Sequence, residues 1–427
     1  MREMKDSRVP WLGQIPKEWE VAPLWRTLRK RNEDNHSDEI VLSLYRDLGI
    51  VPKDSRDDNH NVTSLDTTNY KFVRIGDFVI NKMKAWQGSM AVSGFQGIVS
   101  PAYHVCEFIN KNVDPHYLHF LLRDSTYLPE YDRLSTGLRV GQWDLSYDDF
   151  KNIPHLIPPY KEQQQIVEFL NSKCADIDIV IEKSKTSIKE YTKLKQSIIT
   201  SAVTKGLRDN RPMKISGIKW IDLIPEDWIE SKIKYETQYN IESLTEQTDN
   251  DFEFDYIDIG SVEYGIGITH TERCKFGSAP SRARRVVHNG DVIVSTVRTY
   301  LKAMAKINAI SFPTIVSTGF AVLTCMKGFL ADFLYYYVQS VPFIEFVITH
   351  STGIGYPSIN CSDLVSASIL KPSIEEQAEI ASYLDQKCSE IDSLIASKEK
   401  FITELEIYKK SLIHEYVTGK KEVPTTV

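Results

Sequence analysis

The sequence has few cysteines, no long apolar run and no excess of positive charge, and each absence excludes a class of protein. The six cysteines in 427 residues form no Cys-x-x-Cys pair, so a disulfide scaffold is not expected. The most apolar stretch, residues 329–348, is interrupted by Asp332, Pro342 and Glu345, which favours a protein core over a membrane span. The charged first residues lack the apolar segment of a secretory signal. We therefore expect a cytoplasmic protein without membrane association.

The formal net charge of −7 is unusual for a protein that binds nucleic acid, because such proteins commonly carry a basic surface. The charges are unevenly distributed, however. Residues 242–258 contain seven acidic and no basic residues, whereas residues 271–306 contain eight basic and two acidic residues. Either a basic face exists beside acidic regions, or partner proteins supply much of the positive charge.

The most prominent positive feature is a segment that occurs twice. Residues 158–204 and 372–418 align without a gap, and 17 positions are identical. A related phrase, Trp-x-x-x-Ile-Pro-x-x-Trp, opens each half at residues 11–19 and 220–228. The period is far longer than that of a solenoid repeat. The sequence therefore predicts two similar halves, each a globular domain followed by a helix.

The repeated segments predict two long helices, since residues 161–205 and 374–418 contain neither proline nor glycine. Apolar residues recur at alternating steps of four and three, which is typical of a coiled coil. The predicted seam comprises Leu170, Ile177, Ile181, Ile188 and Ile198, and then Leu384, Ile391, Ile395, Ile402 and Leu412. Each helix would be roughly 65 Å long. The simplest partner for each helix is the other one, paired antiparallel within the chain.

Two polar positions interrupt the seam. We expect Ser184 to face its repeat mate Lys398, and Lys195 to face Lys409. Such positions either fix the register of the helices or are simply solvated.

The predicted fold is mixed α/β, with two globular domains separated by an antiparallel coiled coil and related by a pseudo-two-fold repeat. The expected boundaries are 1–157 for the first globular domain, 158–205 for the first helix, 206–371 for the second domain and 372–427 for the second helix and tail. Apolar runs at 71–81 and 286–297, each broken by Gly-Asp, predict strand–turn–strand hairpins. Aromatic segments at 117–122 and 332–338 predict short helices.

No set of residues predicts catalysis. Ile157-Pro158-Pro159-Tyr160 is similar to the motif of amino-methyltransferases, but Ile157 cannot accept the hydrogen bond that their first residue receives from the substrate. His116 and His119 lack a third metal ligand. Cys174 and Cys388 occupy matched seam positions, which favours small buried residues over nucleophiles.

The duplicated pattern resembles the specificity subunits of bacterial type I restriction–modification systems. In both copies a proline precedes Glu-Gln, Leu and Ile-Asp at the same spacing, the segment ends in Val-Thr, and the Trp-x-x-x-Ile-Pro-x-x-Trp phrase opens the half. The resemblance covers nearly the whole chain. It implies two target-recognition domains, each of which reads one part of a bipartite double-stranded DNA target with an unread spacer.

The resemblance also implies the partners. The long helices would dock two modification subunits, which bind S-adenosylmethionine and methylate adenine, and restriction subunits with motor and nuclease activity would join them. The specificity subunit itself would be non-catalytic and bind no cofactor or metal.

Candidate DNA contacts are side chains that can reach base edges or phosphates from loops. The segments at residues 81–88 and 295–302 follow apolar strands at corresponding positions, and the glycine-containing loops 135–143 and 351–360 are also matched. These loops either approach DNA or simply form the turn before the long helix. The candidates are Tyr45, Arg46, Lys82, Lys84, Trp86, Gln87, Arg139 and Gln142 in the first half, and Arg282, Arg284, Arg285, Arg298, Tyr300 and Lys302 in the second.

Two alternatives stay open at the level of the sequence. The chain could be a scaffold whose two domains bind proteins, or a self-contained methyltransferase or nuclease. A test of DNA binding, with and without modification subunits, distinguishes a protein scaffold from a DNA-binding subunit. A methyltransferase or nuclease would have to be active as the isolated chain with S-adenosylmethionine or a divalent metal.

Overall fold

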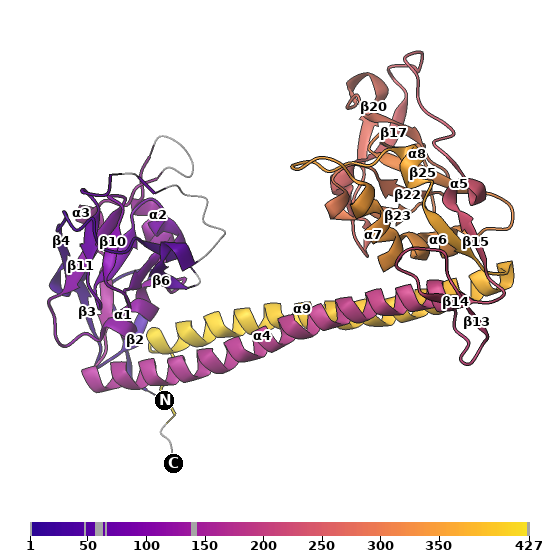
Figure 1. The fold of residues 1–427 in the computed structure, drawn as a ribbon. Helices are drawn as coiled ribbons and strands as arrows, with labels where there is room; N and C mark the ends of the chain where they lie inside the picture. Colours follow the sequence, from indigo (N-terminus) through magenta and orange to yellow (C-terminus); the bar gives the residue numbers. More distant parts are fainter. Residues whose placement is uncertain (1, 47, 56–62, 65, 138–142, 425–427) are drawn as a thin grey trace. The chain divides into compact units, whose positions relative to one another are not determined.

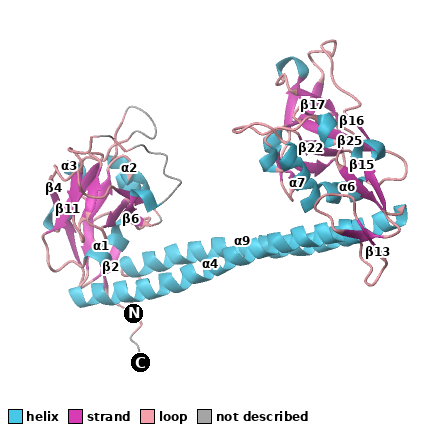
Figure 2. Cartoon of the chain, viewed as in Figure 1, coloured by secondary structure: helices cyan, strands magenta, loops and turns pink. Residues whose placement is uncertain are grey.

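The chain forms two compact α/β units. The computed structural model describes residues 2–424 except 47, 56–62, 65 and 138–142. One unit comprises Met1–Ser184 with Lys400–Val427, and the other comprises Lys185–Glu399. Each contains strands and short helices (Figure 2), as the sequence predicts. The long helices α4 (Tyr160–Lys205) and α9 (Ile374–Val417) each contribute a segment to both units (Figure 1).

The first unit is built mainly from short antiparallel strands. Its strands are β1 (Met4–Asp6), β2 (Gln14–Pro16), β3 (Glu20–Pro23), β4 (Leu28–Arg31), β5 (Leu42–Tyr45), β6 (Gly49–Pro52), β7 (Lys71–Val73), β8 (Phe78–Asn81), β9 (Met90–Val92), β10 (Gly97–Val99), β11 (Tyr103–Phe108) and β12 (Pro154–Ile157). Its helices besides α4 and α9 are η1 (Leu24–Arg26), η2 (Lys53–Ser55), η3 (Ala85–Gln87), α1 (Pro115–Leu122), α2 (Leu128–Leu134) and α3 (Tyr147–Phe150).

The second unit has a matching set of elements. Its strands are β13 (Met213–Ile215), β14 (Leu223–Pro225), β15 (Ile229–Lys232), β16 (Thr237–Tyr239), β17 (Glu253–Ile257), β18 (Val262–Glu263), β19 (Gly267–Ile268), β20 (Glu272–Lys275), β21 (Ala283–Val286), β22 (Val292–Ser295), β23 (Met304–Lys306), β24 (Thr314–Ser317), β25 (Phe320–Cys325) and β26 (Ser368–Lys371). Its helices are α5 (Ile233–Glu236), η4 (Ile259–Ser261), η5 (Phe276–Ser278), η6 (Thr299–Leu301), α6 (Ala331–Val338), α7 (Val341–His350) and α8 (Cys361–Leu364).

One four-stranded sheet and one two-stranded pair have the same strand order in both units. A four-stranded antiparallel sheet has the order β4-β11-β8-β9 in the first unit and β16-β25-β22-β23 in the second. The pair β12-β3, which precedes α4, corresponds to β15-β26, which precedes α9. The internal repeat of the sequence is therefore a repeat of strand order.

The predicted hairpins at 71–81 and 286–297 are wrong. In the first unit β7 pairs with β10, whereas β8 pairs with β11 and β9. In the second, β21 pairs with β24, and β22 pairs with β25 and β23. The strand–turn–strand order itself is present, with Gly76 and Gly290 at φ of 90° and 91°. The turn passes the chain from one sheet to another, because each flanking strand pairs with other strands and not with its neighbour across the turn.

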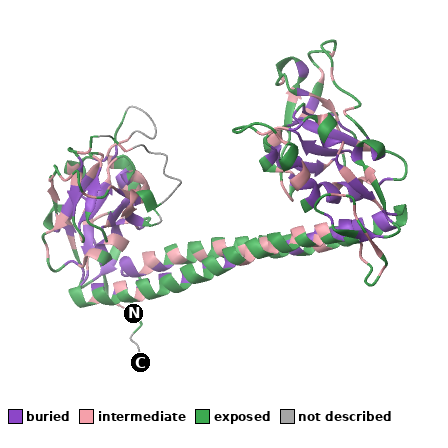
Figure 3. Cartoon of the chain, in the orientation of Figure 1, coloured by how far each residue is buried: buried purple, intermediate pink, exposed green. Residues whose placement is uncertain are grey.

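Two short aromatic helices are confirmed close to where the sequence predicts them, as α1 and α6. Tyr117 and Leu118 in α1, and Phe333 and Leu334 in α6, are fully buried. Each helix packs into the main core of its unit. Figure 3 shows that buried residues follow the sheets and these helices, while α4 and α9 are exposed over much of their length.

The segments of α4 and α9 in the first unit run antiparallel. Lys409 Nζ donates to Asp178 Oδ1 and Oδ2 at 2.6 Å and 2.7 Å. The rings of Phe169 and Tyr416 lie 4.6 Å apart. Residue numbers rise along α4 as those of the contacting residues fall along α9.

The same direction holds in the second unit. Lys195 Nζ donates to Asp392 Oδ1 and Oδ2 at 2.8 Å and 2.7 Å. The ammonium group of Lys398 lies 6.0 Å from the ring centroid of Tyr191.

The expectation that Lys195 faces Lys409 is wrong. Each lysine pairs with an aspartate of the other helix, and the two pairs Asp178–Lys409 and Asp392–Lys195 are repeat mates of one another. The reason is geometric. In an antiparallel pair, repeat mates can face each other only at the centre of the pair.

The predicted seam residues divide into two groups by exposure. The buried ones are Leu170, Ile177, Ile181, Leu384, Ile391 and Leu412. The half-buried ones are Ile188, Ile198, Ile395 and Ile402.

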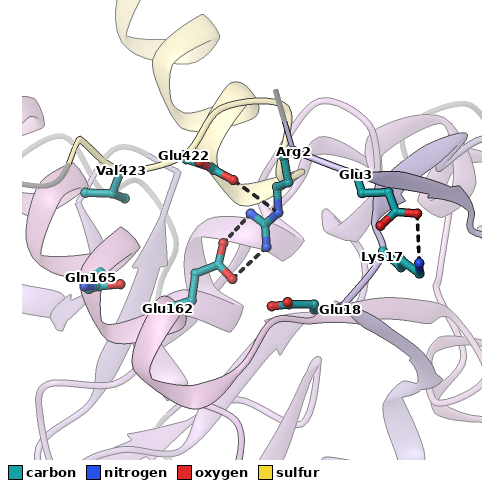
Figure 4. Close-up of a pocket in the computed structure, with 8 residues that line it drawn as sticks. All are labelled: Arg2, Glu3, Lys17, Glu18, Glu162, Gln165, Glu422 and Val423. Carbon is teal, nitrogen blue, oxygen red and sulfur yellow. Dashed lines mark hydrogen bonds and ion pairs between the residues drawn. The ribbon is translucent and has the colours of Figure 1, made fainter.

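A carboxylate of α4 holds the opening segment of the first unit. Trp19 is fully buried, and its Nε1 donates to Glu162 Oε2 at 3.0 Å. Arg2 Nη2 donates to the same oxygen at 2.8 Å, and Arg2 Nε lies 3.7 Å from Glu422 Oε1. Figure 4 shows Arg2 between the two carboxylates, in a pocket of about 360 Å³. The first tryptophan phrase is thereby fixed to the start of α4.

The second unit repeats this anchor. Trp228 Nε1 donates to Glu376 Oε2 at 2.9 Å, and the Arg211 guanidinium forms an ion pair with the same carboxylate. Arg211 also lies over the Trp228 ring, 5.6 Å from its centroid. The repeated glutamate and tryptophan are therefore partners in one buried contact.

The repeated glutamine holds the entrance of the short aromatic helix. Gln163 Oε1 accepts from the backbone N–H of Asp114, the residue that caps α1, at 2.7 Å. Gln377 Oε1 accepts from the backbone N–H of Leu330, at the start of α6, at 2.8 Å. Both glutamines are fully buried. The Glu-Gln pair thus fixes each globular part to a long helix.

Candidate nucleic-acid interface

In the first unit, the chain leaves β8 through residues 82–88, the first strand-end loop. The backbone N–H of Asn81 donates to Ser89 O at 3.0 Å and closes the loop. Gly88 has a φ of 77°, and a Cβ there would lie 2.9 Å from Leu128 Cδ2. Glycine is therefore required for the loop to pack against α2.

Residues 143–145, the end of a second loop (135–145) that we call the first glycine loop, pack against it. The backbone N–H of Leu145 donates to Lys82 O at 3.0 Å. Lys82 Nζ lies 2.9 Å from Asp144 Oδ2, and the rings of Trp86 and Trp143 meet edge to face at 5.5 Å. Two loops that the sequence marks separately therefore form one surface.

In the second unit, residues 296–302 form the second strand-end loop. The backbone N–H of Ser295 donates to Ala303 O at 2.9 Å, as Asn81 does to Ser89. Arg298 and Lys302 both have a φ of 50°. Left-handed backbone at a residue other than glycine costs about 1–3 kcal/mol and is common at functional sites.

The second glycine loop, residues 351–359, packs against this loop. The backbone N–H of Ile359 donates to Thr296 O at 2.9 Å. This bond is the repeat mate of the one from Leu145 to Lys82. The Arg298 guanidinium lies 5.4 Å from the ring centroid of Tyr356. The pairing of a strand-end loop with a glycine loop is therefore common to both units.

Both strand-end loops lie in stretches free of acidic residues. Residues 78–106 and 292–331 contain no aspartate or glutamate, and neither do residues 346–362 of the second glycine loop and its flanks. The acidic stretch at 242–258 is partly neutralised elsewhere, since Asp255 pairs with Arg273 at 2.6 Å and Asp251 with Lys275 at 3.0 Å. A chain of negative net charge thus has no acidic residue in either strand-end loop or in the second glycine loop, whereas Asp144 of the first glycine loop pairs with Lys82.

The predicted contacts of the first unit are spread over two places. Lys84 is exposed, while Lys82, Trp86 and Gln87 are half-buried in the loop contact. Tyr45 and Arg46 lie at the end of β5, and Arg46 is exposed. Lys84 also lines a cavity of about 340 Å³ with residues of β5, β8 and the start of β11. Arg139 and Gln142 lie outside the described residues.

The predicted contacts of the second unit fall into two groups. Arg298 and Tyr300 are exposed on the second strand-end loop, and the Lys302 ammonium lies 5.3 Å from the Tyr264 ring centroid. The other group, Arg282, Arg284 and Arg285, lies at β21 in a different sheet.

The arginines at β21 differ in accessibility. Arg282 is exposed. The Arg284 guanidinium stacks over Phe276 at 4.6 Å, and Arg285 Nη1 is buried without a hydrogen-bond partner among the described residues. Of these three candidate contacts, only Arg282 is exposed.

Three exposed side chains beside the cations were not singled out from the sequence. Met83 projects from the first strand-end loop, and Ile354 and Tyr356 project from the second glycine loop. The feature of the sequence that could have identified them is an apolar or aromatic residue within a loop that also contains glycine and basic residues. Composition alone did not separate them from core residues.

A metal site and a membrane span are both absent from the described part of the chain. No group of three or more His, Cys, Asp or Glu side chains there is arranged to hold a metal ion. Among the same residues, no helix is long and apolar enough to cross a membrane. His116 is exposed and His119 half-buried on α1.

Comparisons of sequence identify relatives along the whole chain. The family model "Type I restriction modification DNA specificity domain" matches residues 35–190 and 229–406. The chain is 25% identical to the "Putative type I restriction enzyme MjaX specificity subunit" of Methanocaldococcus jannaschii, over 97% of this chain and 96% of the relative. It is 26% identical to the "Type I restriction enzyme MjaVIII specificity subunit" of the same organism, over 83% of both chains.

Comparisons of structure agree on the fold. A chain solved under the description "Structural basis underlying complex assembly and conformational transition of the type I R-M system" matches with a TM-score of 0.70 at 15% identity, over 95% of this chain and 99% of that one. The HsdS subunit from Thermoanaerobacter tengcongensis matches with a TM-score of 0.53 at 16% identity, over 95% and 98%. Because the family model covers most of the sequence in two copies, the chain belongs to the family of type I restriction modification DNA specificity domains.

Proposed function

We propose that the chain reads a bipartite double-stranded DNA target, each unit contacting one half-site through its strand-end loop and glycine loop. The observation that carries the proposal is the repeated loop pair, closed by the same bonds from Leu145 to Lys82 and from Ile359 to Thr296. The loops differ in their side chains, so the two units would read different sequences. Arg298, Lys84 and Tyr300 are exposed there, and such groups can reach base edges or phosphates.

The long helices would act as a spacer and as a docking surface. In this proposal α4 and α9 form one antiparallel coiled coil that sets the number of unread base pairs between the half-sites. Two modification subunits would dock on the helices, where Ile407 and Tyr408 form adjacent exposed apolar positions of α9 and Leu394 a further one. Restriction subunits would join that complex in the cytoplasm.

The chain would be non-catalytic, with S-adenosylmethionine bound by the modification subunits. Burial raises the pKa of the Cys106 and Cys325 thiols to about 12 and that of Cys388 to about 11. A thiol with such a pKa is almost wholly protonated at neutral pH and is a poor nucleophile. This supports a division of labour in which the chain supplies recognition and its partners supply chemistry.

A gel-shift experiment tests the proposal. The chain is mixed with duplex DNA pools, with and without modification subunits, and bound DNA is sequenced. Enrichment of two short sequences at a fixed separation supports the proposal. Assembly with the modification subunits but no enrichment of any sequence would instead support a protein scaffold, and methylation or cleavage by the isolated chain would overturn the non-catalytic assignment.

A further inference from the structure

We propose that Ile354 is an apolar wedge that enters between adjacent base pairs of the half-site contacted by the second unit. The inference rests on the proposed DNA-reading function and adds the mode of contact. Proteins that insert an apolar side chain at a base step partly unstack it and kink the duplex.

The first observation is the exposure of Ile354. Its relative accessibility is 107%, higher than that of any other large apolar side chain described as exposed. Burying an isoleucine side chain is favourable because it removes apolar surface from water. Single exposed apolar residues are common on protein surfaces, so exposure alone does not assign a role to this one.

The second observation is the shape of the loop that carries it. Ile354 stands between Gly353 and Gly355, and Gly353 has a φ of 105°. A Cβ at Gly353 would lie 3.0 Å from Tyr356 O, so only glycine lets the chain fold back this tightly. The turn places the isoleucine at the tip, with little side-chain volume on either side of it.

The third observation is that the base of the loop is held firmly. Thr352 and Ser358 exchange backbone hydrogen bonds of 2.8 Å and 2.9 Å. The hydroxyls of Thr299 and Ser351 lie 2.9 Å apart and join the loop to the second strand-end loop. A tip on a fixed base loses little conformational freedom when it inserts, which favours binding.

The fourth observation is the chemistry around the tip, which fits nucleic acid. Arg298 lies against the exposed ring of Tyr356, and Lys302 follows on the same loop. No carboxylate occurs in residues 292–331 or 346–362. Phosphates would be attracted by the cations, and base faces would contact the apolar and aromatic tip. An apolar pocket of a partner protein would not need the cations.

The inference concerns the second unit alone. The first glycine loop includes residues 138–142, which lie outside the described residues. Ile215 offers a matched control, because it is also an exposed isoleucine of the second unit, at 86%, but belongs to β13 and to neither loop.

The test uses the complex of this chain with its modification subunits and duplex oligonucleotides carrying the target mapped for the wild type. A single adenine analogue, 2-aminopurine, is placed at successive positions, since its fluorescence rises when a base is unstacked. With the wild type, we expect a rise at one step of one half-site. Ile354→Ala should abolish that rise and weaken binding by about 10-fold, Ile354→Leu should restore both, and Ile215→Ala should behave as the wild type.

The outcomes separate this inference from the proposed function. If the wild-type complex bound no DNA sequence selectively, the DNA-reading function itself would fall, and the wedge with it. If the wild type bound its target while Ile354→Ala bound equally well, the wedge alone would be overturned. If Ile354→Ala instead weakened assembly with the modification subunits, the tip would be a protein contact, which also contradicts the wedge.

Discussion

Lys195 of α4 donates hydrogen bonds to both carboxylate oxygens of Asp392 in α9, at 2.8 Å and 2.7 Å. Their repeat mates, Lys409 and Asp178, form the same ion pair in the first unit. Lys195 has an additional bond, from Nζ to the backbone carbonyl of Gly265 at 3.0 Å, at the tip of the β18–β19 hairpin. The lysine of the second unit therefore joins the paired helices to the globular part.

Replacement of this lysine should destabilise the second unit more than the matched change destabilises the first. We expect Lys195→Ala to cost about 1–2 kcal/mol, because it removes a largely buried ammonium with three acceptors, and Lys409→Ala to cost at most about 1 kcal/mol. Hydrogen exchange of each unit in the two variants measures this difference. Equal losses of protection would show that the Gly265 contact contributes nothing.

The buried anchors should be sensitive to loss of their carboxylates. Glu376→Ala leaves the buried Trp228 N–H without its acceptor and removes one of the two carboxylates of Arg211, which keeps Asp227 at 2.6 Å. We therefore expect a loss of about 3 kcal/mol, at the low end for a broken buried ion pair. Glu162 is more exposed, with 22% side-chain accessibility against 6% for Glu376. Its replacement should cost roughly 1–3 kcal/mol.

Urea denaturation followed by tryptophan fluorescence measures both anchor variants. Glu168→Ala, an exposed change on α4, is the control and should be neutral. The assignment of the repeated glutamate as an anchor fails if all three variants unfold at the same urea concentration.

The first unit should lose stability in mild acid. Burial lowers the pKa of His104 and His155 to about 4 and that of His119 to about 3. An unfolded histidine titrates near 6.5, so the unfolded chain binds more protons as the pH falls below that value. The stability from the neutral rings is complete above about pH 6.5 and is lost as the pH falls towards 4, by up to about 1.4 kcal/mol per histidine and pH unit.

Hydrogen exchange at pH 7 and pH 5, corrected for the intrinsic rate, reveals the effect around these histidines in the first unit. His155→Gln should reduce the pH dependence there. Protection that fell equally in both variants, or did not fall at all, would contradict the assignment.

Arg298 should contribute to recognition of one half-site. If it contacts a guanine with two hydrogen bonds, Arg298→Ala should cost about 1–3 kcal/mol and relax the preference at one position. If it contacts phosphate, binding should weaken evenly across sequences and depend less on salt. Arg273→Ala is the control, because Arg273 is already paired with Asp255. An Arg298→Ala variant with unchanged affinity and preference would remove Arg298 from the interface.

The length of the helices should determine the spacer. Deletion of Ile181–Ser187 and Ile395–Phe401 removes one heptad from each helix and keeps the outer pairs Asp178–Lys409 and Lys195–Asp392 in register. The coiled coil would shorten by roughly 10 Å, or about three base-pair steps. A binding-site selection should show a changed spacer or no binding, and an unchanged spacer would refute the spacing role.

The sequence predicts the elements of this fold better than their pairing. Helices α1 and α6 follow from the short aromatic segments at 117–122 and 332–338, since that signal is local. The hairpins at 71–81 and 286–297 are wrong because β7 and β8, like β21 and β22, belong to different sheets and pair with other strands. The offset of the repeat likewise identifies which residues are equivalent, but it does not identify which residues of the two helices are in contact. Lys195 and Lys409 are equivalent, yet each pairs with an aspartate.

The candidate site was predictable in part. The strand-end loops and glycine loops are recognisable in the sequence as matched segments. Their mutual contact depends on the backbone hydrogen bonds of Leu145 and Ile359, which cannot be predicted from side-chain identity. The Glu-Gln pair was visible as an identity between the repeats. Its role required the buried tryptophans and the entrances of α1 and α6 to be placed beside it.

Mapping of methylated adenines across the genome, in cells with and without this chain, tests the central claim most directly. The account predicts that methylation dependent on the chain occurs only where two short sequences stand at one fixed separation, with any bases between them. Methylation that did not change on removal of the chain, or that followed a single uninterrupted sequence, would contradict it.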